Sequence, residues 1–587
     1  MSAWATGISR TAEQYELVPS DQRLSEDDQD GGHTGDVIFT SNLPGPRPTA
    51  AQCIKLRHVP GEVPWTAYAI ALVELAERAS YYGVGGLFPN FVQRPLPAGG
   101  PGTGAPPPNS QLTPGALGMG LQVSTALSVI FSLLAYTTPL LGGILADLRW
   151  GKFKTIAVGT GIAGVAHGLS VYAALPTLLQ NGGVFVPFLL GLLLLGGSAG
   201  LIKANIAPIM AEQYNPSTDY VETLPNGEKV IIDREATIQK IMSAYYGSIN
   251  IGAFIAISST FAEKYVGFWL AFLIPCLIFL IMPFILYPIY PKLVPSPKSS
   301  SSTLIDTYHQ ARTYFSSSQH TQYKLEEDDS IEHGNHIDEH GFGKIIQACK
   351  FFSFFVVYNI ADGGLNALLT SLAGSMTTNG VPNDFLGHAN PLIIVVSIPL
   401  LNRYVYPYFA ARRIAFGPVK RVLVGFLLAA GGMAWAAIIQ HVVYQTSPCG
   451  YQATTCEQGS GVSPLVGCHL SFGPRGTRTE EPSQRTNLND FLQSAWLVLP
   501  SFILSGLSES FAVVSAMEIG YMLSPPSLRS IINSLFLFTQ ALSAASILIF
   551  LPIMKDPYLV WPFVITTIIT LTATWFVWRL FSHLDNR

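Results

Sequence analysis

The chain has 587 residues, of which 49% are hydrophobic and only 12% are charged, and its mean hydropathy is +0.35. Soluble globular domains carry about 25% charged residues, so this composition excludes an ordinary soluble enzyme and a disordered chain. The 33 Lys and Arg residues against 37 Asp and Glu residues give a net charge of −4, which leaves no basic surplus for binding nucleic acid. The composition is typical of a protein that crosses the lipid bilayer many times.

Long apolar segments recur along the chain. A helix needs about 20 mostly apolar residues to span a bilayer, which predicts an all-α membrane protein with about twelve transmembrane helices. These spans are expected at residues 65–92, 118–146, 153–175, 185–212, 241–260, 266–290, 345–374, 390–411, 418–443, 491–521, 527–550 and 558–581. A polar segment separates the sixth span from the seventh, so the spans divide as 6+6. This pattern resembles the major facilitator fold, in which two six-helix halves surround a site at the bilayer midplane.

The polar segments divide the chain into five parts. We expect a disordered cytoplasmic tail over 1–62, an N-terminal six-helix bundle over 63–291, a central loop over 292–344, a C-terminal six-helix bundle over 345–582 with an extracellular loop over 446–490, and a short tail over 583–587. No apolar segment opens the chain, so no cleavable signal peptide is expected.

Basic residues near the span ends predict the orientation. The loops after spans three and seven hold no Lys or Arg, whereas the loops after spans two and eight hold Arg149, Lys152, Lys154, Arg412, Arg413, Lys420 and Arg421. Because cytoplasmic loops carry the excess of Lys and Arg, both termini and the central loop are expected in the cytoplasm. The 446–490 loop is then extracellular.

Three of the 6 cysteines, Cys449, Cys456 and Cys468, lie in that extracellular loop. An oxidising compartment would let two of them form a disulfide, and the alternative is three unpaired thiols. A metal site is not expected, because the loop offers only His469 beside them.

The first predicted span contains three charged residues, Glu74, Glu77 and Arg78. A charge inside a span costs about 2.5–3.5 kcal/mol on insertion scales, so it indicates function. Spacings of three and four place these side chains on one helix face. One guanidinium cannot neutralise two carboxylates, so one carboxylate needs a proton or a second cation. This arrangement is typical of a proton-coupled carrier; the alternative is a buried salt bridge that only packs helices.

Other charges also fall inside spans. Lys203 in the fourth span could supply the second cation by pairing with a first-span glutamate, or could extend its ammonium to the membrane surface. Glu509 in the tenth span suits a substrate ammonium group, and otherwise makes a hydrogen bond that packs helices. Asp362 in the seventh span precedes two glycines, which predicts a broken helix of the kind found at transporter gates.

Several motifs match one family in the expected order. They are Glu74-x-x-Glu77-Arg78 with Tyr81-Tyr82-Gly83, Ala135-Tyr136 and Asp147-Leu-Arg-Trp-Gly151-Lys152, Gly200-Leu-Ile-Lys203-Ala-Asn205, Tyr245-Tyr246-Gly-Ser-Ile-Asn250, Ala262 to Trp269, and Val381-Pro-Asn-Asp384. Across roughly 70–580, the chain resembles the proton-dependent oligopeptide transporters (the POT/PTR, or peptide transporter, family), and the last two motifs resemble its fungal branch.

The resemblance implies a proton-coupled symporter that imports di- and tripeptides across the plasma membrane by alternating access. It implies a proton-coupling cluster of Glu74, Glu77, Arg78 and Lys203. It implies a substrate site that includes Tyr81, Tyr82, Tyr136, Tyr246, Asn250 and Glu509, and a gate loop with Asp147 and Lys152. Asp362 is added to the substrate site because of its position in the seventh span. The expected partners are small peptides, protons and the lipid bilayer, and the carrier is expected to be a monomer without cofactor or metal. No motif for ATP binding or for hydrolysis appears, so we expect no enzyme activity.

The chain also departs from the family pattern. Ala79 replaces the usual Phe after the first-span Arg, Ala204 replaces the usual Pro after the fourth-span Lys, and Gly85 stands where bacterial and animal members carry an Arg. Two alternatives therefore stay open. One is a carrier of the same fold for nitrate, an amino-acid derivative or a secondary metabolite. The other is a transport-inactive nutrient receptor, which would not need the ionic cluster.

Overall fold

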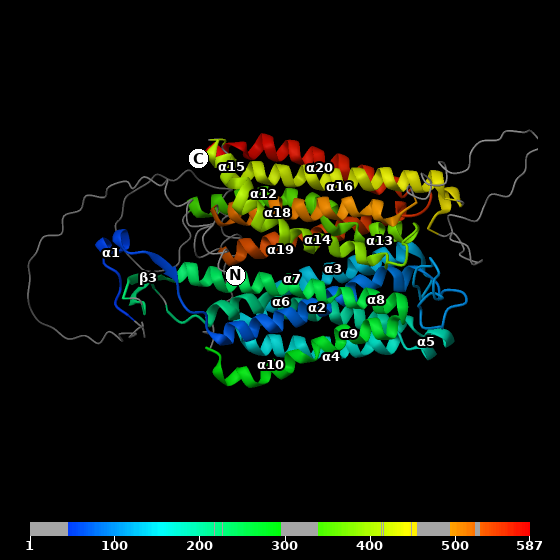
Figure 1. The fold of residues 1–587 in the computed structure, drawn as a ribbon, viewed down its shortest axis with the longest axis horizontal. Coiled ribbons are helices and arrows are strands. Elements are labelled where there is room, and N and C mark those ends of the chain that lie inside the picture. The colour runs from blue at the N-terminus through cyan, green and yellow to red at the C-terminus, as the bar shows by residue number, and fades with distance from the viewer. Residues whose placement is uncertain are drawn as a thin grey trace, which may run out of the picture.

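The structure is a computed structural model, and the residues it describes are 45–216, 218–225, 227–294, 339–412, 414, 416–447, 449–454, 493–522 and 529–586. Most of the predicted central loop and extracellular loop, with Cys456 and Cys468, lies outside the described residues, as do residues 1–44 of the predicted tail. Long helices dominate the described part and run side by side along its length (Figure 1).

Residues 45–294 form the first set of helices. They are α1 (Ala50–Lys55), α2 (Trp65–Gln93), α3 (Gly120–Leu145), η1 (Ala146–Trp150), α4 (Lys152–Ala173), α5 (Pro176–Asn181), α6 (Phe185–Glu212), α7 (Arg234–Ile255), α8 (Ile257–Tyr265), α9 (Phe268–Phe279), α10 (Ile281–Ile289) and η2 (Tyr290–Lys292).

Residues 339–586 form the second set. They are α12 (Glu339–Asn359), η3 (Ile360–Gly364), α13 (Asn366–Gly374), η4 (Asp384–His388), α14 (Ala389–Leu400), η5 (Leu401–Val405), α15 (Tyr406–Ala411), α16 (Pro418–Thr446), η6 (Gly450–Gln452), η7 (Ala495–Val498), α18 (Leu499–Met522), α19 (Arg529–Phe550), η9 (Leu551–Ile553), α20 (Val560–Phe581) and η10 (Ser582–Asn586).

The predicted transmembrane helices are present. Within the described residues, eleven helical stretches are long and apolar enough to cross a membrane. The 29-residue helix α2 is the twelfth span, and it carries three charged residues near its middle. The span predicted at 185–212 has the same bounds as α6, and the other predicted bounds differ by a few residues. The all-α, twelve-helix prediction is therefore confirmed.

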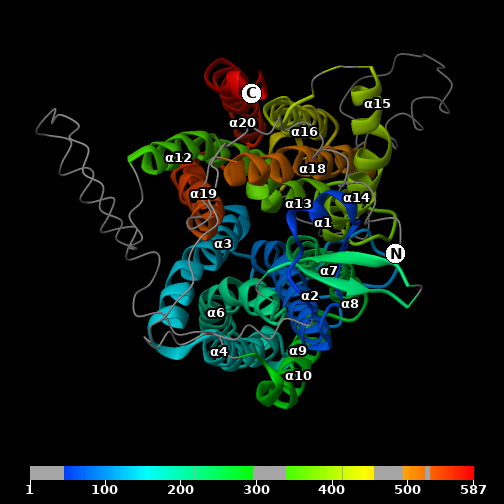
Figure 2. The same cartoon turned by 90° about the vertical axis from the view of Figure 1, so that its left-hand side faces the viewer.

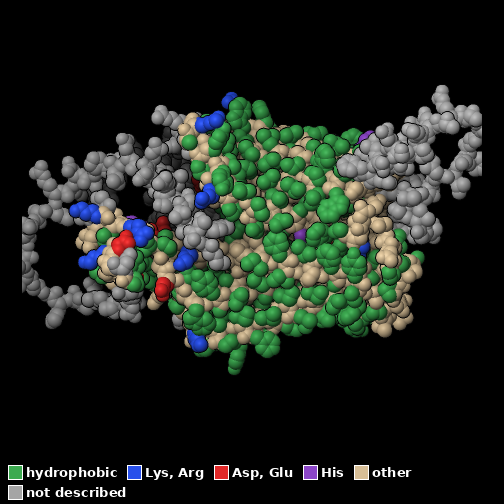
Figure 3. Space-filling model, viewed as in Figure 1, with side chains coloured by type: hydrophobic (Ala, Val, Ile, Leu, Met, Phe, Trp, Pro, Cys, Tyr) green, Lys and Arg blue, Asp and Glu red, His purple; other side chains and the backbone are tan. Residues whose placement is uncertain are grey.

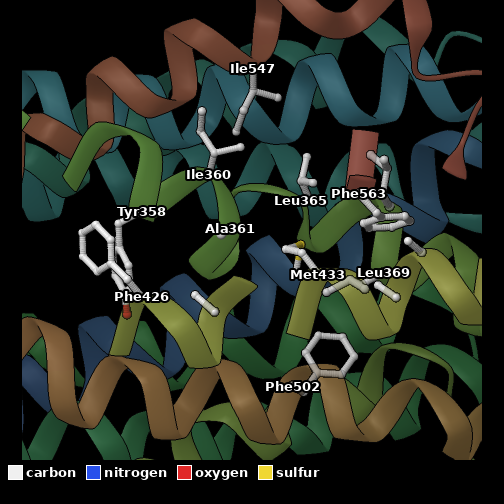
Figure 4. Packing of buried hydrophobic residues seen from close by; sticks show 14 of the residues in the cluster. Tyr358, Ile360, Ala361, Leu365, Leu369, Phe426, Met433, Phe502, Ile547 and Phe563 are labelled. Carbon is white, nitrogen blue, oxygen red and sulfur yellow. The ribbon is translucent and has the colours of Figure 1, made fainter. Parts of the chain in front are cut away.

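Each set of helices buries its own apolar core. One buried cluster draws its residues from positions 67–289, and the other draws them from 348–581 together with Leu121 and Val129 of α3. In the end view the second set lies above the first, with α19 beside α3 (Figure 2). In the second core, Tyr358 stacks on Phe426 with ring centroids 4.9 Å apart (Figure 4).

Small residues bring helices into close contact, as expected where the hydrophobic effect between lipid-facing helices is absent. A Cβ on Gly200 of α6 would lie 1.8 Å from the Thr138 hydroxyl of α3. A Cβ on Gly425 of α16 would lie 2.6 Å from the Cβ of Ala512 on α18. Close helix packing thus holds each half together from within.

A small sheet lies at one end of the helices, which we call the sheet end. Its strands β1 (His58–Pro60), β2 (Tyr220–Thr223) and β3 (Lys229–Asp233) are ordered β1-β3-β2, with β1 parallel and β2 antiparallel to β3. Residues 1–62 are expected from the sequence to form a disordered tail, but within this range the structure has helix α1 and strand β1. Strand β1 is ordered by pairing with β3, about 170 residues away, and no local sequence pattern indicates such a contact.

The distribution of apolar and basic side chains on the surface fits a protein that spans a membrane. Figure 3 shows hydrophobic side chains covering the middle of the visible face, with most of its Lys and Arg at the sheet end. We call the other end, which holds α5 and η4, the distal end (Figure 1). The loop with Cys449 follows α16 at this end. Cys449 is disulfide-bonded, which excludes the alternative of three unpaired thiols in this loop.

Candidate functional site

The three charged residues of α2 form a buried cluster in mid-span. Arg78 Nε lies 3.2 Å from Glu74 Oε1 and also forms an ion pair with Glu77. The side chains of all three are at most 3% exposed. One guanidinium therefore serves two carboxylates, as the helical spacing predicts, and the fully ionised cluster carries one excess negative charge.

Lys203 of α6 lies beside this cluster and interacts electrostatically with Glu74 and Glu77. Its ammonium is 4.1 Å from the ring centroid of Tyr136 and 5.2 Å from that of Tyr81. Among the described residues it forms no ion pair within 4.0 Å, so the predicted direct pair with a first-span glutamate is absent in this conformation. Cation–π contacts hold the ammonium instead.

The Tyr81 ring connects the two cations, because Arg78 Cζ lies 4.9 Å from its centroid. Helix α7 completes the environment of the cluster. A Cβ on Gly252 would lie 2.8 Å from both Arg78 Cβ and the Ala79 backbone nitrogen, so glycine permits α7 to approach α2 at this level. The backbone of Ala79, a residue that departs from the family pattern, thus lies at this contact.

Two neighbours of the cluster, one half-buried and one buried, are not among the expected site residues. Tyr245 of α7 interacts with Glu74 and Arg78; its place in the Tyr245-Tyr246 motif was a usable signal. His167 of α4 has Nε2 2.5 Å from Ser80 Oγ, and both side chains are 1% exposed. Ser80 follows Glu77 by three residues and so lies one turn away on α2.

Glu509 of α18 faces the first half from the second. It interacts electrostatically with Tyr82, Tyr136 and Tyr246 of the first half. Tyr82 and Tyr246 are 37% and 38% exposed although they lie within spans, so accessible surface exists between the halves at this level. The structure thus brings together the predicted tyrosines and the predicted anion.

Asp362 lies close to Glu509, and the two carboxylates interact electrostatically. The predicted break in the seventh span is present in η3, where Asp362 has φ −99° and ψ 78° and Gly363 has φ +96°. Ser505 of α18 donates a hydrogen bond to Asp362 Oδ1, and Asn390 of α14 donates to Ser505 Oγ at 2.9 Å. Since Ser505 and Glu509 are four residues apart, the break positions Asp362 one helical turn from Glu509.

Three further predicted residues lie outside this central group. Asn250 is 7% exposed, and its amide donates to the Tyr246 carbonyl of its own helix at 2.8 Å. Lys152 forms an ion pair with Glu212, which joins the start of α4 to the end of α6 at the sheet end. The backbone of Asp147 lies in η1, and its side chain is outside the described part.

The two halves touch at the distal end. Gln93 Nε2 donates to Ser371 Oγ at 2.7 Å, and Lys264 Nζ donates to the Val381 carbonyl at 3.0 Å. The central group is therefore closed toward the distal end. Motifs around Lys264 and Val381 marked the family resemblance in the sequence, which gave no sign that they meet.

A sequence model described as the POT family matches residues 153–466, which is more than half of the chain. The chain belongs to the POT family. It is 38% identical over 545 residues to the MFS-type transporter ucsM of an Acremonium species, over 90% of this chain and 86% of that protein. It is 33% identical over 543 residues to the peptide transporter PTR2 of Candida albicans, over 88% of this chain and 82% of that protein.

A solved structure agrees on the fold. The crystal structure of the POT family transporter PepTSo matches with a TM-score of 0.61 at 16% identity, over 90% of this chain and 99% of that one. The chain is thus an integral membrane protein with the major facilitator fold of POT transporters. This family and fold are those of a transporter rather than an enzyme.

Proposed function

We propose that this POT family member is a proton-coupled symporter that imports di- and tripeptides across the plasma membrane. The observation that carries the proposal is that charged residues lie in mid-span on both halves and face each other. Glu74, Glu77 and Arg78 are buried in one half, and Glu509 faces the tyrosines of that half from the other. The 33% identity to a protein named peptide transporter PTR2 supports a peptide substrate.

A small peptide is a zwitterion with an ammonium group at one end and a carboxylate at the other. Glu509, with Asp362 beside it, provides negative charge for the ammonium group. Arg78 and Lys203 provide positive charge for the carboxylate. The exposed rings of Tyr82 and Tyr246 offer apolar contact with a hydroxyl for hydrogen bonding, which suits a site that accepts many side chains.

Proton coupling follows from the shared guanidinium. While both glutamates are ionised, Arg78 is held by Glu74 and Glu77. A proton on either carboxylate removes one of these ion pairs and frees Arg78 for the peptide carboxylate. Proton and peptide then favour the same conformation, which is the thermodynamic requirement for coupled transport.

The proposed orientation puts the sheet end and both termini in the cytoplasm. Lys and Arg gather at the sheet end, as the positive-inside rule requires of a cytoplasmic face (Figure 3). The disulfide of Cys449 at the distal end fits an oxidising extracellular medium. Because the halves are in contact at the distal end, this conformation is then closed to the outside. The proposed carrier works as a monomer.

Uptake of a labelled dipeptide, with and without a protonophore, tests the proposal in cells that lack other peptide carriers. We expect accumulation that rises as the external pH falls and collapses when the protonophore is added. Accumulation that is unaffected by the protonophore would contradict proton coupling, and absence of dipeptide uptake would contradict the substrate.

A second candidate function is transport of another solute by the same fold: nitrate, an amino-acid derivative or a secondary metabolite. Ala79 and Ala204 change the surroundings of the coupling residues, and the relative with 38% identity is named as an MFS-type transporter without a substrate. A competition panel separates the classes: dipeptides should displace labelled dipeptide, whereas free amino acids and nitrate should not. Signalling without net uptake would instead indicate the receptor alternative.

A further inference from the structure

The contact between the halves at the distal end is a network of polar side chains, which we call the distal clasp. Asn90 of α2 and Asn383 of the second half exchange two amide hydrogen bonds, at 2.9 and 3.0 Å. Lys264 of α8 donates to the Thr378 hydroxyl at 3.1 Å and to the Val381 carbonyl at 3.0 Å. Further bonds join Gln93 to Ser371, Thr113 to Gly374 and Tyr265 to Gly380. Separating the halves at this end must break all of these bonds.

Two carboxylates are buried in the distal clasp. Glu263 of α8 is 0% exposed and Asp384 of η4 is 6% exposed, and the two interact electrostatically across the halves. Glu263 Oε1 accepts a hydrogen bond from Asn90 at 2.6 Å. Glu263 Oε2 has no hydrogen-bond partner among the described residues, and neither oxygen of Asp384 is in good hydrogen-bond geometry, although the backbone N–H groups of Asp384 and Phe385 lie beside it.

Nearby cations do not form ion pairs with these carboxylates in the described part of the chain. Lys264 is near both, but its ammonium donates hydrogen bonds to a hydroxyl and a carbonyl of the second half. The other ionisable groups on the elements packed around the pair are Arg94 after α2, Tyr265 on α8 and His388 on η4. The guanidinium of Arg94 has two buried nitrogens without a partner and lies toward Gly374 and Asn383.

Burying two unpaired carboxylates close together is unfavourable unless at least one of them binds a proton. When the halves separate at the distal end, water reaches both side chains and both can ionise. The closed clasp therefore holds more protons than the open clasp. By linkage, a higher proton concentration at the distal face shifts the equilibrium toward closure.

We propose that Glu263 and Asp384 form a second proton-binding site, separate from the α2 cluster, through which external pH controls closure of the distal clasp. The inference rests on the proposed orientation and on alternating access, and it does not depend on the identity of the substrate. A proton arriving from outside would meet this pair before Glu74 and Glu77. Its binding would close the clasp behind the substrate.

Cysteine accessibility tests the proposal in intact cells that express the full chain. Ser371 is 1% exposed in the closed clasp, so S371C reports opening of the distal end to a membrane-impermeant thiol reagent. The exposed last residue of α5, changed as N181C, corrects for the effect of pH on the thiol reaction itself. The same chain without either new cysteine gives the background. No substrate is added, so the result does not depend on peptide transport.

We expect the S371C-to-N181C labelling ratio to rise with external pH, by up to about tenfold per unit if one proton is released on opening. In the E263Q/D384N background the ratio should be low and independent of pH, since both side chains are permanently neutral. A ratio that does not depend on pH in the parent chain, or that depends on pH equally in the double variant, would overturn the proposal.

E77Q provides a test that does not require the clasp variants to fold. The pH dependence of the labelling ratio should persist in E77Q, because the clasp pair is unchanged. If E77Q removes that dependence, the pH response belongs to the α2 cluster and the second site is refuted.

Discussion

Lys203 and Tyr136 form a cation–π pair in which the ammonium lies 4.1 Å from the ring centroid. The pair joins α6 to α3 and keeps the ammonium near Glu74 and Glu77 without a direct ion pair. An ammonium held by a ring retains its charge for a second partner. This is the position from which Lys203 can meet a peptide carboxylate once the α2 cluster has bound a proton.

Replacing Tyr136 with Leu should therefore weaken peptide binding. A cation–π contact contributes about 0.5–2 kcal/mol, so the apparent affinity should fall roughly two- to thirtyfold. Tyr136→Phe keeps the ring and is the matched control, which should retain most of the affinity. Competition of unlabelled dipeptide against labelled dipeptide measures both variants, and an equal loss in the two would assign the effect to the hydroxyl instead.

Glu509→Ala should weaken binding of the peptide amino end. Loss of a hydrogen bond to a charged group costs about 1.5–3 kcal/mol, so the apparent affinity should fall roughly ten- to hundredfold. Inhibition by an N-acetylated dipeptide, which has no ammonium group, should change much less. Unchanged affinity for the free dipeptide in Glu509→Ala would refute the assigned role of this residue.

Glu77→Gln should separate proton coupling from peptide movement. The neutral amide cannot release a proton, so uptake against a gradient should be lost, whereas exchange of labelled for unlabelled peptide should persist because it needs no net proton movement. Accumulation and counterflow in reconstituted vesicles measure the two processes. Retained accumulation in this variant would remove Glu77 from the coupling cluster.

Gly252→Ala should disturb the contact between α7 and α2. The added Cβ would lie 2.8 Å from Arg78 Cβ and from the backbone of Ala79, and overpacking of this kind costs about 1–3 kcal/mol. Gly247→Ala on the same helix is the matched control, since a Cβ there meets nothing within 4 Å. Thermal unfolding in detergent should show a lower midpoint for Gly252→Ala only; equal midpoints would contradict the packing described.

The features that follow from local chemistry could be predicted from the sequence. Spans are predictable because a bilayer demands about 20 apolar residues of each helix. The shared face of Glu74, Glu77 and Arg78 follows from helical periodicity, and the break at Asp362 follows from the glycines after it.

Features that depend on how distant elements meet could not be predicted. The cation–π position of Lys203 depends on the rotation of α6 relative to α3, which spacing along one helix does not determine. Strands β1 and β3 are only three and five residues long, lie far apart in the sequence and are stabilised by each other. Asn90 and Asn383 are 293 residues apart, and no local pattern indicates that their amides pair.

Peptide-driven proton movement is the most direct test of the central claim, that buried carboxylates of α2 couple protons to peptide import. Vesicles containing the protein and an internal pH indicator receive dipeptide outside, with the membrane potential clamped. We predict that dipeptide acidifies the interior with the parent chain and does not do so with Glu77→Gln. Accumulation of dipeptide by the parent chain without acidification would contradict the claim.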